Sequence, residues 1–128
     1  MVVTSSCSSD DDASSGSIQA QQQTATIGDL NNCNTSIGTG TIIELTIPYT
    51  ASAGVTIEQL QINTQVSDGG SDSGVNTLFT DDGSEIGWVS CFRFGDQSWV
   101  EYEVRLESID GVLSNPTTVR IDRPNGAE

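Results

Sequence analysis

The sequence predicts an all-β fold: an antiparallel β-sandwich of about seven strands behind a disordered N-terminal tether. Three observations support this prediction. Apolar residues recur at every second position over short runs, clusters of Gly, Asn and Asp separate the runs, and no helical period extends over ten residues. One buried face on each sheet explains the alternation, and polar outer faces explain why only 34% of residues are hydrophobic.

The chain of 128 residues predicts a single folded domain flanked by two short segments. Residues 1–22 are rich in Ser, Asp, Gly and Gln, which bury too little apolar surface to offset the entropy of an ordered chain. We therefore expect a low-complexity tether over residues 1–22, the sandwich over residues 23–124 and a C-terminal tail over residues 125–128.

Three strands are expected in the first half of the domain. Residues 24–30 predict a weak strand and residues 41–50 a strong one, in which Pro48 favours a sheet edge or a bulge. Residues 56–66 favour a strand over a short helix because they include β-branched Thr and Ile. The side chains expected to face the core from the last two strands are Ile43, Leu45, Ile47, Tyr49, Leu60, Ile62 and Val66.

Four strands are expected in the second half. Residues 75–79 predict a short edge strand, residues 85–94 and 99–109 predict long strands, and residues 117–122 complete the set. The side chains expected to face the core from the two long strands are Ile86, Trp88, Phe92, Phe94, Val100, Tyr102, Val104 and Leu106. Cys91 and Trp99 have the opposite parity and are expected to point outward.

The charge is strongly acidic, with 18 Asp and Glu against four basic residues, no His and a net charge of −14. All four basic residues are Arg. Such a chain repels nucleic-acid phosphates and anionic lipids, so we expect no nucleic-acid partner and no membrane contact except through a lipid anchor. An acidic surface without Lys suits salty surroundings and indicates a marine or halophilic source; the alternative is a GC-rich genome that uses Arg for Lys.

The residue types present predict a protein that is not an enzyme. The absence of His excludes Ser-His-Asp and Cys-His catalysis, and no Gly-rich loop followed by Lys is present to bind phosphates. Paired carboxylates remain as catalysts, but they need a cleft between them, and a thin sandwich offers little. We expect no cofactor apart from a possible calcium ion.

Two acidic loops are the candidates for that calcium site. The stretch "SDGGSDSG" contains Asp68 and Asp72, and "TDDGSE" contains Asp81, Asp82 and Glu85. If the sandwich brings the two loops together, five carboxylates converge, and calcium takes six to eight oxygen ligands. Neither loop has the spacing of an EF-hand, and the alternative is two solvated polar turns.

The three cysteines predict one disulfide and one leftover thiol. Cys7 lies in the expected tether, so Cys33 and Cys91 form the candidate pair. In an oxidising compartment this bond would stabilise a thin core by about 2–4 kcal/mol. The alternative is two separately buried thiols.

The last third of the chain carries a resemblance to a known family. The stretch "WVEYEVRLESIDGVLSNPTTVRI" resembles the final two strands of a fibronectin type III or related immunoglobulin-like domain. The matching residues are Tyr102, Val104, Leu106, Gly111, Ser114, Asn115, Pro116, Val119 and Ile121. The resemblance implies that the Tyr102 hydroxyl bonds to backbone. Residues 41–50 lack the tryptophan of the fibronectin type, whose volume Trp88 or Trp99 would fill.

The N-terminus carries a second resemblance. The stretch "SSCSSDDD" is similar to the lipoprotein processing site of Bacteroidetes-type bacteria, and "MVVTSSC" to the tail of a signal peptide. The resemblance implies a lipid on Cys7 and export to the outer cell surface, with the acidic run as the export signal. An acyl chain anchors by about 0.8 kcal/mol per buried methylene, and the polar tether would hold the domain clear of the surface.

These observations lead to two functional hypotheses. The first is a non-catalytic, surface-exposed or secreted immunoglobulin-like module that binds a protein or glycan, acts in adhesion, or serves as a spacer; outward-facing Trp99 is its candidate partner-binding residue. The alternative is a structural subunit, such as a virion decoration protein or an extracellular filament component, that self-assembles by strand exchange. Residues 15–27 are the candidate exchanged tail.

Overall fold

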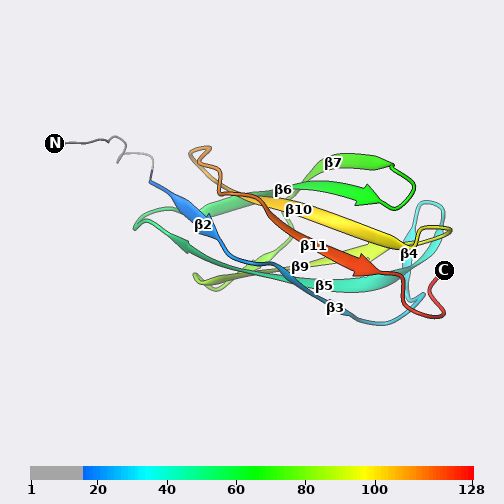
Figure 1. Ribbon diagram of the computed structural model, residues 1–128. Helices are drawn as coiled ribbons and strands as arrows, with labels where there is room; N and C mark the ends of the chain where they lie inside the picture. The colour runs from blue at the N-terminus through cyan, green and yellow to red at the C-terminus, as the bar shows by residue number, and fades with distance from the viewer. Residues whose placement is uncertain (1–15) are drawn as a thin grey trace.

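A computed structural model describes residues 16–128, and the predicted lipidation site at Cys7 lies outside them. This part of the chain contains ten strands in two antiparallel sheets and no helix, so the predicted all-β fold class is confirmed (Figure 1). The strands are β2 (Ile18–Ala20), β3 (Thr24–Ile27), β4 (Cys33–Thr35), β5 (Gly38–Ala51), β6 (Ile57–Val66), β7 (Ser71–Asn76), β8 (Thr80–Asp81), β9 (Glu85–Phe92), β10 (Trp99–Ser108) and β11 (Thr117–Asp122).

The two sheets form the layers of a β-sandwich. One has the strand order β11-β10-β6-β7, and the other has the order β2-β5-β9-β8, with β3 and β4 also paired to β5. Residues 18–35, which we call the N-terminal segment, therefore run antiparallel along one strand in three short sections. The β5 strand is 14 residues long, and it carries this segment on one side and β9 on the other.

The core lies between the sheets and contains most of the side chains that alternation predicted, although Ile62, Val66 and Phe92 are only partly buried at its margin. Ile43, Ile47, Val100, Val104 and Leu106 are each 0% exposed, because they project inward from strands whose other face meets solvent. Trp88 is buried at 6% exposure, and its ring packs edge-to-face on Tyr102 with centroids 5.2 Å apart. Trp88 rather than Trp99 therefore occupies the core.

The boundary predicted between tether and sandwich is wrong. Ile18 is 3% exposed and Ala20 is 8% exposed, and both belong to a strand that pairs with β5. The predicted C-terminal tail is also part of the fold, because Ala127 is 2% exposed and its carbonyl accepts from Arg123 Nη2 at 2.7 Å. The folded domain therefore extends through both ends of the described chain.

The predicted edge strand at residues 75–79 is displaced. The strand β7 occupies residues 71–76, most of which were expected to form a loop, and every residue before Asn76 is exposed. Its Ser, Asp and Gly residues have low strand propensity, so pairing with β6 rather than local preference determines this element.

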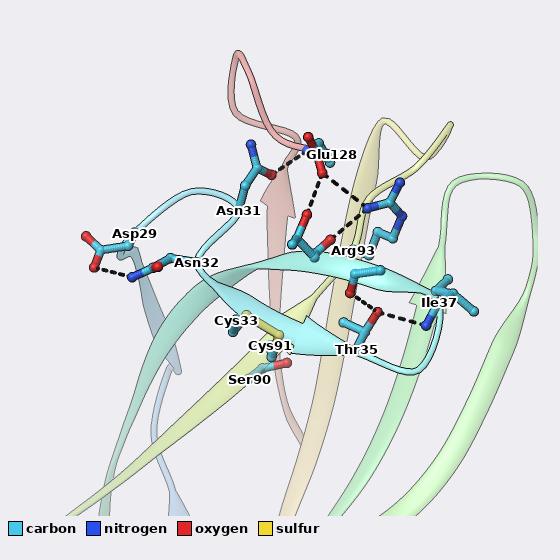
Figure 2. Close-up of a disulfide and its surroundings, with 12 residues drawn as sticks. Asp29, Asn31, Asn32, Cys33, Thr35, Ile37, Ser90, Cys91, Arg93 and Glu128 are labelled. Atoms are coloured by element: carbon cyan, nitrogen blue, oxygen red, sulfur yellow. Dashed lines mark hydrogen bonds and ion pairs between the residues drawn. A yellow bond between two sulfur atoms is a disulfide. The ribbon is translucent and has the colours of Figure 1, made fainter.

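The predicted disulfide between Cys33 and Cys91 is confirmed, with Cα atoms 6.0 Å apart (Figure 2). It joins β4 to β9 across the outer face of β5. Gly40 lies beneath the bridge, where an added Cβ would come within 3.0 Å of Cys91 Sγ and 2.9 Å of the Phe92 carbonyl carbon. Only a residue without a side chain fits under this bond, which ties the N-terminal segment to the body of the sheet.

Candidate functional site

The sandwich has two long sides, and one of them is sealed by side chains. On this side the Asn115 amide accepts from Ala20 N at 2.8 Å and donates to Ala20 O at 2.9 Å, as a paired strand would. The Thr117 hydroxyl accepts from Gln23 N at 2.9 Å and donates to Gln21 O at 2.8 Å. These bonds join the N-terminal segment to the start of β11, and we call this border the sealed side.

The opposite border, between β7 and β9, is open. Register with β6 places Asp72, Gly74 and Asn76 on the inner face of β7, and none of them is apolar. The short strand β8 pairs only with Ile86 and Gly87 of β9. Among the described residues, β8 and the half-buried Phe79, which packs against the core, lie beside the start of β9. The strand β8 does not extend along the rest of β9, and we call this border the open side.

The open side contains a groove of three adjoining hollows. A hollow of about 380 Å³ lies at the Phe92 end of β9, a second of about 200 Å³ follows, and a third of about 630 Å³ lies beside residues 76–80. The first two share Ser90 and Tyr102, and the second and third share Trp88. Gly74 widens the groove, because an added Cβ there would meet nothing within 4 Å.

The floor of the groove is aromatic and carries hydrogen-bonding groups. The Tyr102 and Ser90 hydroxyls lie 2.7 Å apart, so the backbone partner implied for Tyr102 by the family resemblance is replaced by a side chain on β9. Burial raises the pKa of Tyr102 to about 12, against a smaller opposing effect of the Ser90 hydrogen bond. The indole Nε1 of Trp88 is buried with no hydrogen-bond partner among residues 16–128, so an unsatisfied donor belongs to a residue that lines two of the hollows.

Exposed apolar side chains line the rim. Leu78 is 83% exposed and Val89 is 60% exposed, and both line the largest hollow. Val75, at 58% exposure, lines the middle hollow. Apolar side chains gathered around a hollow with a few polar groups are typical of a binding site.

The charge of the groove is negative. Asp72 lines the first two hollows, and the described residues that line the three hollows include no Arg. A ligand that carries positive charge is therefore favoured over an anionic one.

The structure does not bring the two predicted calcium loops together. The turn before Glu85 is at the start of β9, whereas Asp68 accepts from Gln97 Nε2 at 2.8 Å in the loop after β9. An eight-residue strand separates them by roughly 25 Å. Residues 16–128 contain no group of three or more acidic or Cys side chains placed to hold a metal, so the prediction of one shared site is wrong.

The acidic side chains of these loops instead hold the turns in place. Asp82 Oδ1 accepts from the backbone N–H of Ser84 at 2.9 Å and of Glu85 at 2.8 Å. Asp81 accepts from the Tyr49 hydroxyl at 2.7 Å. The hydrogen bond from Gln97, followed by that from the Gly70 N–H, lowers the pKa of Asp68. Asp72 is apart from these turns, on β7 in the groove.

Trp99 does face outward as predicted, but its ring is covered. The Arg120 guanidinium lies 3.8 Å from the centre of the Trp99 ring, and its Nε is 3.6 Å from the Glu101 carboxylate. The indole is therefore half-buried against a neighbour in its own sheet. The candidate binding site is the groove on the open side rather than Trp99.

Sequence reasoning missed the groove because Trp88 and Tyr102 have the parity of core residues. The sequence does contain one sign of the groove: the inward positions 72, 74 and 76 of β7 hold Asp, Gly and Asn, where a strand that packs on the core would have apolar residues.

Comparison with protein-family models, with characterised protein sequences and with solved structures gives no match. Among residues 16–128, no helix is present that is long and apolar enough to cross a membrane.

Proposed function

We propose that this protein is a non-catalytic, immunoglobulin-like binding module displayed outside the cytoplasm, and that the groove on the open side holds its ligand. The observation that carries the proposal is the groove itself. It combines buried aromatic rings, the Tyr102 and Ser90 hydroxyls and exposed apolar residues, which together favour recognition. It lacks a pair of facing carboxylates that could act as acid and base among its described lining residues.

The strand order supports the immunoglobulin-like assignment. With the N-terminal segment as strand A and the following strands as B, C, C′, D, E, F and G, the sheets read A-B-E-D and G-F-C-C′. The A-B-E-D sheet and the G-F-C core of its partner are the immunoglobulin arrangement. Proteins with this fold bind many unrelated ligands through their loops, sheet edges and sheet faces. The fold therefore does not identify the ligand, which must be inferred from the residues of the groove.

The disulfide supports a location outside the cytoplasm. Cys91 is exposed and Cys33 is half-exposed, so cytoplasmic reductants would have access to the bond and would break it.

A lipid on Cys7 remains part of the proposal. Intact mass of the protein purified from its native cells tests it: we expect a chain beginning at Cys7 with added acyl mass, and an unmodified Met1 would contradict the anchor.

The assembly alternative loses its candidate tail. Residues 18–20 and 24–27 pair with β5 of their own chain, and Ile18 fills their own core. The segment proposed for exchange therefore completes this domain. The structure offers no specific observation that favours the assembly hypothesis over binding.

Two libraries test the binding function. The full chain with its disulfide is screened against random peptides of about twelve residues, a length that exceeds one strand, and against an array of immobilised glycans. We expect ligands from one library whose binding is lost in Gly74→Val, because the added side chain fills the groove. Gln65→Val is the matched control, because Gln65 is exposed on the outer face of the neighbouring strand β6 and lines none of the three hollows. No ligand from either library would contradict the proposal.

A further inference from the structure

We infer that the ligand is an extended peptide segment with basic side chains, which adds as a strand to the free edge of β9. This inference rests on the proposed function of the groove and names its ligand class. It requires three features: unpaired backbone groups on β9, space for a strand beside them, and a charge that selects the partner.

The unpaired backbone groups belong to Val89 and Cys91. Residues along an antiparallel strand direct their N–H and C=O alternately to the two sides. The carbonyls of Glu85 and Gly87 accept from Asp82 N and from Thr80 Oγ1, so these residues face β8. Val89 and Cys91 share their parity, but within the described chain β8 ends before it reaches them. Their donors and acceptors therefore point from β9 into the open side.

The groove has room for a strand at this edge. A strand added to β9 would lie about 4.8 Å from it, over the hollows that Trp88, Ser90 and Tyr102 line. Alternate side chains of the added strand would enter the groove, and the others would lie beside Val89 on the outer face.

Charge selects the partner. The chain carries a net charge of −14, and Asp72 faces the position of the added strand. A second copy of this chain would bring the same charge to the same edge, where like charges oppose association. A segment with Lys or Arg is attracted, and its backbone satisfies the ladder groups of Val89 and Cys91. A glycan has no peptide backbone that could pair with β9, so the test must distinguish glycan binding from peptide binding.

The decisive experiment uses the strongest peptide from the random library, synthesised and titrated into the full oxidised chain by calorimetry. We expect a net-basic peptide whose Kd rises about tenfold or more in Val89→Pro, which removes the edge N–H. Val89→Ala is the comparison variant, because it keeps the N–H and removes only side-chain contact, so its loss of affinity should be several-fold smaller than that of Val89→Pro. Raising the salt from about 0.05 M to 0.5 M should weaken binding through screening.

A second readout guards against a Val89→Pro chain that fails to fold. In the unaltered protein, hydrogen exchange of the Val89 and Cys91 amides should slow when the peptide binds. Protection elsewhere, or an enriched peptide that is acidic, overturns the inference. Glycan ligands without peptide ligands overturn it as well while the binding function stands, and no ligand of either kind overturns both.

Discussion

The sealed side and the open side of this sandwich meet the same physical problem in opposite ways. Each is a border where backbone donors and acceptors have no strand partner. On the sealed side, Asn115 and Thr117 provide those partners from side chains, and Gln23 is 1% exposed beneath them. On the open side, the inner positions of β7 are polar or empty, and the β9 edge stays free. A border closed by side chains supports the fold, and one left unpaired can bind.

The largest expected effect comes from the covalent tie that holds the N-terminal segment in place. The double change Cys33→Ser and Cys91→Ser opens a loop with a sequence separation of 58, which predicts a loss of about 4 kcal/mol in the free energy of unfolding. Urea denaturation of this variant and of the unaltered oxidised chain measures it. Equal midpoints for the two proteins would show that the segment is held without the bond.

The next effect tests the hydrogen bonds of the sealed side. Thr117→Val keeps the shape of the side chain but leaves Gln23 N and Gln21 O without their partner, which should cost about 2 kcal/mol. Thr118→Val is the control, because Thr118 is exposed one position along the same strand. If the urea midpoints shift equally for both variants, the Thr117 hydrogen bonds do not stabilise the sealed side as we expect.

A smaller effect concerns pH on the open side. Burial raises the pKa of Tyr102 to about 12 from the ordinary tyrosine value of 10.0, so the folded state favours the neutral phenol. The resulting stability is complete below pH 10 and is lost as pH rises through 12, with about 1 kcal/mol gone by pH 11. Urea unfolding at pH 9 and 11 should show this loss, and Tyr102→Phe should reduce it. Burial and the Asp81 hydrogen bond also raise the pKa of Tyr49, so some loss remains in the variant.

The smallest effect is the most informative about the groove. Gly74→Val should change the free energy of unfolding by less than about 0.5 kcal/mol, because the new side chain meets nothing within 4 Å and a β-branched residue suits a strand. Ligand binding should be lost all the same. A large drop in the thermal midpoint would mean that the inner face of β7 is packed, contrary to an open side.

The sequence allowed the long strands and their faces to be predicted, because burial on one face leaves a two-residue pattern. Val100 to Leu106 show it clearly. Residues 18–22 were missed, although the strand at residues 24–27 was predicted, because their Gln and Ala residues carry no such pattern. Their partners Asn115 and Thr117 lie more than 90 positions away along the chain. The groove was missed because parity shows which way Trp88 points, and only the pairing of β7 shows what lies opposite.

The three-section pairing of the N-terminal segment also has a mechanical consequence. If the chain is anchored through Cys7, a pulling force reaches the described fold first at Ser17, which is hydrogen-bonded to Ser52, and β2 and β3 can then separate from β5 one short section at a time. Cys33 stops this separation, because its bond transfers the load directly to β9. Residues 18–32 would then act as a reserve of roughly 50 Å of extended chain that is released under load.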